Sequence, residues 1–143
     1  MSQLRILLPV DIQDRQAAFR EITKAMIYLG DRSVDMNFIS ILPGKPVPLL
    51  GSLMPSEELL SALAVLEEDL VELINEALPF LENYTTKAVE GSVHKEILKY
   101  ADELKPDLII LPSHSHSKVE NILIGSVTSK VVEKANCSVL VLR

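Results

Sequence analysis

Hydroxyl and imidazole side chains gather in two short segments near the end of the chain. Serine and histidine alternate over residues 113–117, and Gly125-Ser126-Val127-Thr128 follows seven residues later. A glycine allows a ligand to approach the backbone closely, and the free N–H groups of a helix that begins at Ser126 favour an anion such as phosphate. The hydroxyls of Ser126 and Thr128 could add hydrogen bonds. A Gly-Ser pair that opens a helix is also ordinary capping, so the pattern alone leaves both interpretations open.

Histidines at alternate positions of the first segment raise the alternative of a metal site. On an extended loop, the rings of His114 and His116 can point to the same side and chelate an ion. No cysteine lies nearby in the sequence, and acidic residues are not clustered in this loop. We therefore expect no metal ligands here, and we favour histidines exposed to solvent, one of them beside a phosphate.

The sequence motifs of several catalytic and phosphate-binding sites are absent. The chain contains no Gly-x-x-x-x-Gly-Lys-Ser/Thr, no Gly-x-Gly-x-x-Gly and no Gly-x-Ser-x-Gly. A response regulator would need an aspartate after the third strand and a lysine after the fifth, where this chain has Glu90 and its end at Arg143. We therefore expect no catalytic residues.

Short apolar runs alternate with segments of helical period, and these elements must position the residues above. The runs predict strands over Leu4–Val10, Val34–Leu42, Thr85–Val89, Leu108–Leu111 and Ser138–Leu142. The segments between them predict helices over Arg15–Leu29, from Ser56 to about Pro79, over His94–Leu104 and over Ser126–Ala135. Such alternation predicts an α/β fold with one parallel sheet and helices on both faces. Asp35 and Asn37 indicate that the second strand lies nearer a sheet edge.

Length, charge and cysteine content exclude several classes of protein. The 143 residues fit one domain, 1–143, and the net charge of −6 argues against broad contact with nucleic acid. One cysteine, Cys137, cannot form an internal disulfide, and its apolar surroundings predict a buried, unreactive thiol. No leader pattern and no apolar run of about 20 residues is present, so we expect a cytoplasmic protein without a membrane partner.

The segment Pro43–Pro55 is unusually apolar for a connection. It contains four prolines and two glycines together with several aliphatic residues. One interpretation is a loop that packs back over the edge of the sheet. The other is a lid or a surface for a protein partner, and both stay open.

Nearly the whole chain resembles the universal stress protein family. The segments that carry the resemblance are Pro9-Val10-Asp11, Val89-Glu90-Gly91, Pro106–Ile110, Gly125–Val132 and Cys137–Leu142. The resemblance implies a five-stranded parallel sheet of order 3-2-1-4-5, similar to adenine-nucleotide alpha-hydrolase and Rossmann-like folds. It also implies a homodimer that forms through the last strand, Ser138–Leu142, which is a suitable exposed edge.

The resemblance further implies an adenine nucleotide, ATP or AMP, bound at the C-terminal edge of the sheet. By the resemblance, Pro9, Val10 and Asp11 would line the adenine and ribose pocket, with Ile41 opposite them. Leu111 and Val127 would flank the base. The phosphates would be surrounded by Ser115, His116, Gly125, Ser126 and Thr128. The only metal expected is Mg²⁺ that accompanies a nucleotide. Asp11 is equally consistent with a turn or capping residue.

The phosphate loop departs from the family pattern Gly-x2-Gly-x9-Gly-Ser/Thr. With Gly125-Ser126 aligned, Pro112 takes the place of the first glycine and Ser115 that of the second. Proline has no N–H and a fixed φ, so contacts that need either are lost, which favours AMP over ATP. The alternative is a degenerate member that binds no nucleotide and acts through protein contacts, with a slow ATPase as the third possibility.

Overall fold

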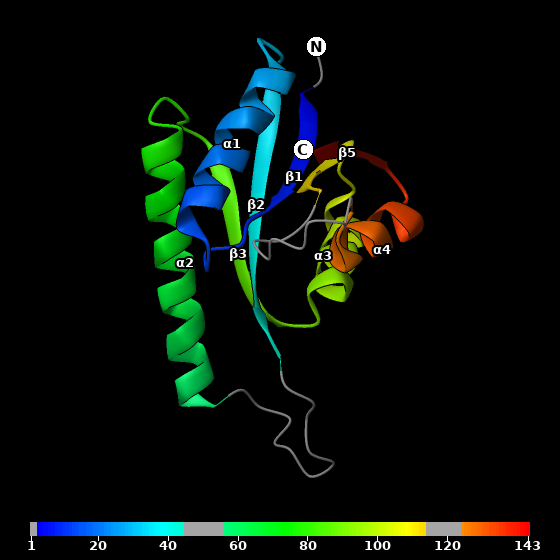
Figure 1. Ribbon diagram of the computed structural model, residues 1–143. Coiled ribbons are helices and arrows are strands. Elements are labelled where there is room, and N and C mark those ends of the chain that lie inside the picture. Colours follow the sequence, from blue (N-terminus) through cyan, green and yellow to red (C-terminus); the bar gives the residue numbers. More distant parts are fainter. Residues whose placement is uncertain (1–2, 45–55, 114–123) are drawn as a thin grey trace.

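The protein consists of strands and helices that alternate along the chain (Figure 1). The structure, a computed structural model, describes residues 3–44, 56–113 and 124–143. The elements are β1 (Leu4–Pro9), α1 (Arg15–Leu29), β2 (Val34–Pro43), α2 (Glu57–Ala77), β3 (Tyr84–Gly91), α3 (Val93–Leu104), β4 (Leu108–Pro112), α4 (Ser126–Lys134) and β5 (Ser138–Leu142). Every strand and helix expected from the sequence is present, with its ends within two residues of the prediction.

The strands form one parallel sheet of order β3-β2-β1-β4-β5, which confirms the predicted order. Helices α1 and α2 cover one face, and α3 and α4 cover the other (Figure 1). On the central strand, Ile6 and Leu8 belong to the core beneath α1 and α2, while Leu7 belongs to the core beneath α3 and α4. All three are at most 2% exposed, as a strand covered on both faces requires.

Side chains cap the starts of two helices. Asp14 accepts a hydrogen bond from the Ala17 N–H at the start of α1, and Ser56 accepts one from the Leu59 N–H at the start of α2. Helix α2 ends at Ala77, just before Pro79 could remove a backbone donor. These caps fix where each helix starts above the sheet.

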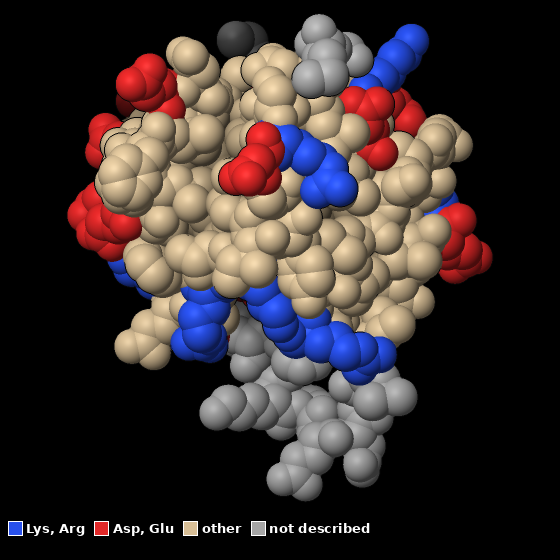
Figure 2. Space-filling view, turned by 90° about the horizontal axis from the view of Figure 1, so that it is seen from above, with Lys and Arg blue, Asp and Glu red and all other residues tan. Residues whose placement is uncertain are grey.

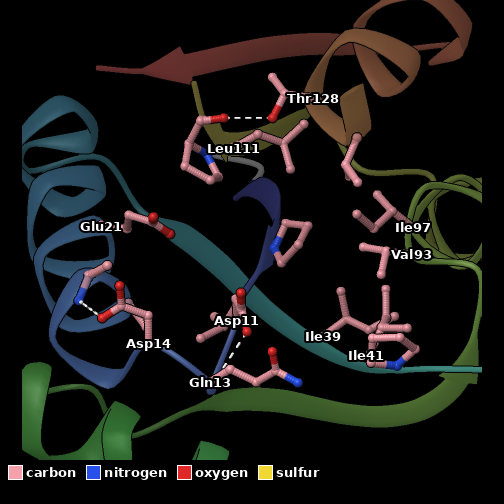
Figure 3. A pocket seen from close by; sticks show the side chains of 17 residues that line it. Asp11, Gln13, Asp14, Glu21, Ile39, Ile41, Val93, Ile97, Leu111 and Thr128 are labelled. Atoms are coloured by element: carbon pink, nitrogen blue, oxygen red, sulfur yellow. Dashed lines mark hydrogen bonds between the residues drawn. The ribbon is translucent and has the colours of Figure 1, made fainter. Parts of the chain in front are cut away.

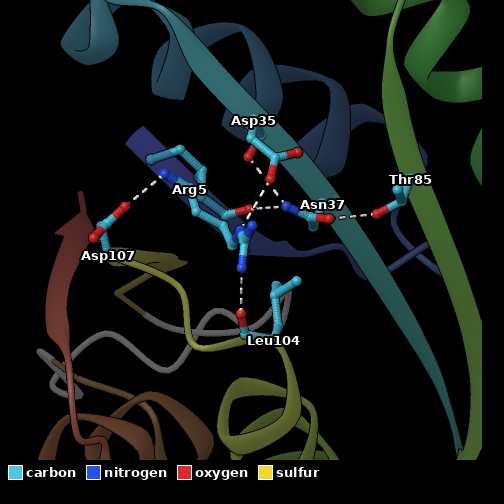
Figure 4. A network of polar contacts seen from close by, with 7 residues as sticks. Arg5, Asp35, Asn37, Thr85, Leu104 and Asp107 are labelled. Atoms are coloured by element: carbon cyan, nitrogen blue, oxygen red, sulfur yellow. Dashed lines mark hydrogen bonds and ion pairs between the residues drawn. The ribbon is translucent and has the colours of Figure 1, made fainter. Parts of the chain in front are cut away.

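A polar network crosses the sheet near the start of its strands (Figure 4). The Asn37 side chain is 2% exposed, donates to the Ile6 carbonyl at 3.1 Å and accepts from the Thr85 hydroxyl. Arg5 pairs with Asp35 at 3.0 Å and donates to the Leu104 carbonyl at 2.9 Å. Strand β2 lies next to the edge strand β3 and so nearer the edge than β1, as its two polar residues predicted. Strand β2 pairs on both sides, and the network explains their polarity.

Charged side chains are unevenly distributed over the face seen from above. Several basic side chains lie along its lower margin and acidic ones at its sides, and an acidic and a basic side chain adjoin in the middle of an otherwise largely uncharged surface (Figure 2). Among the described residues, no helix has the length and apolar character needed to span a membrane.

We predict that Asn37→Ala lowers the free energy of unfolding by about 1–3 kcal/mol, because the Ile6 carbonyl and the Thr85 hydroxyl lose their shared, buried partner. Denaturant unfolding would measure the loss. Asn136→Ala, which removes an exposed amide bonded to Asp102 at 3.3 Å, is the matched control and should cost less than about 0.5 kcal/mol. Equal losses for the two variants would contradict the role of the network.

Candidate functional site

A cavity of about 290 Å³ opens at the carboxyl ends of the central strands. It lies where β1 and β4 separate: their pairing ends at Leu7 and Ile109, whereas β1 stays paired with β2 as far as Pro9 and Ile39. The order of the strands reverses at β1, because β2 and β4 lie on opposite sides of it. Parallel α/β sheets place ligand crevices at this kind of position.

Two prolines stand on the strand edges that face each other across this separation. The Val10 N–H bonds to the Ile39 carbonyl on β2, so an N–H at Pro9 would have pointed toward β4. The Ser113 N–H bonds to the Leu142 carbonyl on β5, so an N–H at Pro112 would have pointed toward β1. At these two positions the strands therefore present carbonyl oxygens but no backbone donors to the cavity.

Most of the residues predicted for the site meet at this cavity. Those that line it are Pro9, Val10, Asp11, Ile41, Leu111, Val127 and Thr128. Gly125 and Ser126 are not among the lining residues, but they lie at the start of α4, directly before Val127. Ser115 and His116 lie outside the described residues, as does the metal alternative at His114 and His116.

The cavity has an apolar wall and an acidic wall (Figure 3). The apolar wall comes from β2, α3 and β4, with Ile39, Ile41, Val93, Ile97 and Leu111. The acidic wall comes from the turn after β1 and from α1, with Asp11, Gln13, Asp14, Ala17 and Glu21. A flat apolar ligand that carries hydrogen-bond donors along one edge would suit both walls.

Several lining residues were not predicted from the sequence. Gln13, Asp14, Ala17, Ala18 and Glu21 come from α1 and the turn before it, and Ile39, Pro43, Val93, Ile97 and Pro112 complete the set. The spacing of Asp14, Ala17, Ala18 and Glu21 by three or four residues places them on one face of a helix. That spacing was visible in the sequence, but it did not show that the face lies over the end of β1.

Asp11 shapes the turn that leads into α1. Its carboxylate accepts a hydrogen bond from the Gln13 N–H at 3.0 Å, as a side chain that stabilises a turn does. The turn role that the sequence left open is therefore present, and Asp11 lines the cavity as well.

The start of α4 is fastened to the end of β4. The Gly125 N–H donates to the Ser113 carbonyl at 2.7 Å, and the Thr128 hydroxyl donates to the Pro112 carbonyl at 2.7 Å. The proton of the Thr128 hydroxyl is thus used within the protein. The first turn of a helix leaves its N–H groups without intrahelical partners, so the backbone of this turn, which faces the cavity through Val127 and Thr128, can donate to a ligand.

The carboxyl of Glu21 is the most perturbed acid of the cavity. Its pKa is raised from the ordinary value of 4.5 to about 7, mainly by burial and also by the nearby charges of Asp11 and Asp14, while Arg20 opposes the shift. Like charges and partial desolvation both disfavour the ionised form. Glu21 therefore changes its charge near neutral pH.

Two further predictions concern metal binding and the cysteine. In the described part of the chain, no group of three or more His, Cys, Asp and Glu side chains is placed to hold a metal ion. Cys137 is partly exposed, not fully buried as predicted. Its partial burial still raises the pKa of the thiol, so the thiolate is disfavoured.

Of the apolar segment Pro43–Pro55, residues 45–55 lie outside the described residues.

Comparisons with known proteins agree with this fold. The sequence model of the Universal stress protein family matches residues 4–143. Universal stress protein MJ0531 of Methanocaldococcus jannaschii is 30% identical over 97% of this chain and 81% of its own length. The solved universal stress protein UspA from Lactobacillus plantarum is 27% identical, with a TM-score of 0.73 over 100% of both chains. The chain belongs to the universal stress protein family.

Three more distant solved structures with this fold are complexes with a nucleotide. One is a universal stress protein with cAMP (17% identity, TM-score 0.68), one is from Archaeoglobus fulgidus with dAMP (19%, 0.60) and one is from Arabidopsis thaliana with AMP (14%, 0.54). Each matches at least 97% of this chain and at least 90% of its own. At these identities they establish the shared fold.

We predict that Glu21→Gln stabilises the protein at pH 8 and flattens the dependence of its stability on pH. A carboxyl whose pKa is higher in the folded state than in the unfolded state stabilises the fold below pH 4.5, and this stabilisation is lost as the pH rises through about 7. The gain at pH 8 should be about 1–3 kcal/mol. Urea unfolding between pH 4.5 and 8 measures it.

Glu82→Gln is the control for this prediction, because Glu82 is exposed in the turn after α2 and does not line the cavity. It should change the stability by less than about 0.5 kcal/mol at either pH. A Glu21→Gln variant with the same pH profile as the unsubstituted protein would contradict the electrostatic account of the acidic wall.

Proposed function

We propose that this universal stress protein is a regulatory module that binds AMP, or a closely similar adenine monophosphate, in the cavity between β1 and β4. The observation that carries the proposal is the cavity itself: an apolar slot at the reversal of strand order, with Asp11 on one side and the start of α4 on the other. We propose a binding function rather than catalysis.

The base and ribose fit the two walls described above. An adenine ring would lie between Ile39 and Ile41 of β2 and Leu111 and Val127 of the opposite side. Its amino group and the ribose hydroxyls are donors, and the carboxylate of Asp11 and the carbonyls at the strand ends are acceptors. The acceptor-rich cavity thus complements the donors of a nucleoside.

The phosphate would lie against the first turn of α4. The N–H groups and the dipole of a helix N-terminus favour an anion, and Val127 and Thr128 bring this turn to the cavity. Pro112 supplies no N–H on the β4 side. With about 290 Å³, the cavity lies near the lower end of the range for small-molecule pockets, about 300–1,000 Å³, which favours AMP over ATP with its Mg²⁺.

The nucleotides found with related folds support this proposal. The three complexes described above contain cAMP, dAMP or AMP, and each of these ligands has a single phosphate. A ligand of that size matches the volume of the cavity.

We predict that AMP raises the melting temperature by about 5–10 °C at a concentration one hundred times its dissociation constant, because a ligand of the folded state stabilises that state. Titration calorimetry gives the affinity for AMP, ADP and ATP, with AMP expected to bind most tightly. Ala17→Leu, which fills the cavity from α1, should weaken AMP binding at least about tenfold.

Ala62→Leu is the matched control, because Ala62 is exposed on α2 and is not a lining residue. It should leave the affinity unchanged. If millimolar AMP, ADP and ATP all fail to shift the melting temperature, the nucleotide proposal is wrong, and a regulatory protein that acts through protein contacts becomes the better description.

The edge strand β5 carries the second part of the proposal, a cytoplasmic homodimer. Strand β5 lies at the end of the sheet, paired with β4 on one side. The Leu142 carbonyl faces β4, where it accepts the Ser113 N–H, so alternation turns the backbone groups of Val141 outward. A second copy could pair with these groups, which would cover the exposed edge.

We predict that Val141→Pro converts the dimer into a monomer, since proline removes an outward N–H while the bonds between β4 and β5 remain. Light scattering coupled to gel filtration would report the mass. Val141→Thr keeps the N–H and the branched shape and should remain dimeric. A Val141→Pro variant that folds and keeps the dimer mass would move the interface away from β5.

A further inference from the structure

The proposed nucleotide cavity carries far more acceptors and negative charge than donors. Asp11, Asp14 and Glu21 line it together, and Pro9 and Pro112 bring no N–H to it. Among the described lining residues there is no lysine, arginine or histidine. A phosphate that enters this cavity therefore meets carboxylates without a neighbouring cationic side chain, apart from whatever residues 114–123 contribute.

Glu21 is the carboxyl whose charge varies in this setting. It extends from α1 into the cavity, one turn beyond Ala17, and lies between Asp11 and Asp14 on one side and the end of β4 on the other (Figure 3). Its pKa of about 7 reflects burial first and the two aspartates second.

The cations nearest along α1 do not enter the cavity. Arg20 lines a separate groove between α1 and α2, beside Phe19, and the Lys24 amine donates to the carbonyl of Arg143. The elements that pack on the other sides of the cavity contribute uncharged residues to its lining: Ile39, Ile41 and Pro43 from β2, Val93 and Ile97 from α3, Leu111 and Pro112 from β4, and Val127 and Thr128 from α4.

We propose that Glu21 is a specificity-determining residue of this cavity, which selects adenine nucleotides of low negative charge over triphosphates and binds them more tightly as the pH falls. The proposal rests on the nucleotide-binding function above and adds the group that sets the charge of the ligand. When Glu21 is protonated, it is neutral and can donate a hydrogen bond to a ligand oxygen. When it is ionised, it adds a third negative charge to the wall that the ligand contacts.

The direction of the pH dependence follows from linkage. An anionic ligand stabilises the protonated form of Glu21, so binding takes up a proton and the affinity falls as the pH rises through about 7. The effect grows with the charge of the ligand, because each phosphate charge adds to the repulsion. A neutral nucleoside should show little dependence on pH.

The test compares ligands whose own charge is constant, because a terminal phosphate titrates near pH 6 and would confuse the result. Calorimetry measures the binding of cAMP, with one fixed charge, and of adenosine, with none, from pH 5.5 to 8.5. The affinity for cAMP should fall by about three- to tenfold over this range, and that for adenosine by less than about twofold.

Variants then assign the effect to one side chain. Glu21→Gln should bind cAMP at pH 8.5 as tightly as the unsubstituted protein does at pH 5.5, with no dependence on pH. It should also improve the binding of ATP at pH 8.5 more than that of AMP. Glu82→Gln, on the exposed turn outside the cavity, should retain the pH dependence of the unsubstituted protein.

A second measurement needs no substitution. Carbon-13 NMR can follow the Glu21 carboxyl during a pH titration, and bound cAMP should raise its midpoint by about 0.5–1 pH unit, the logarithm of the expected change in affinity. If cAMP and adenosine bind but neither the affinity nor the midpoint changes as described, the role of Glu21 is overturned while nucleotide binding stands. If neither ligand nor AMP binds at any pH, the proposed function fails and the role of Glu21 fails with it.

Discussion

The position of β1 between two parallel neighbours is the constraint on which the rest of the structure depends. Because β1 pairs with β2 and β4, its side chains are covered by helices on both faces, and its carboxyl end is the point where the order of the strands reverses. Strands β1 and β4 separate after Leu7 and Ile109, and this separation creates the cavity. If β1 lay at the edge of the sheet, β4 would not stand beside it. The lining residues that follow β1 would then have no second wall across the cavity.

The same separation determines the chemistry of the cavity. A strand that leaves its neighbour exposes unpaired N–H and C=O groups, and an orphaned donor would have a cost in free energy. Proline at positions 9 and 112 removes the donors that would face the gap, and the Pro112 carbonyl is satisfied by Thr128. At these two positions the strands therefore offer no donor to an anion, whereas the first turn of α4 does.

The sequence predicted the fold well, because the fold depends on features that are local. Apolar runs, caps such as Asp14 and Ser56, and proline or glycine at element ends fix where strands and helices begin and end. The site was predicted only in part, because a side chain such as Glu21 looks like any solvent-facing residue of an amphipathic helix until the helix is placed over the end of β1. The hydrogen-bond partners of Asn37 could not be predicted for the same reason, because Ile6 and Thr85 come from neighbouring strands and the pairing of strands is not encoded by local pattern.

The departures from the family's phosphate loop gain a physical meaning from this arrangement. Pro112 replaces a glycine of the family pattern, and it removes a donor from the side of the cavity that faces β1, while its carbonyl holds Thr128 and so keeps α4 in place. For the proposed nucleotide, this proline would weaken contacts to phosphate without disturbing the helix N-terminus that favours an anion. Together with the carboxylates of α1 and the preceding turn, it would shift the proposed binding from recognition of phosphate toward recognition of the nucleoside, whose donors match the acceptors of the cavity.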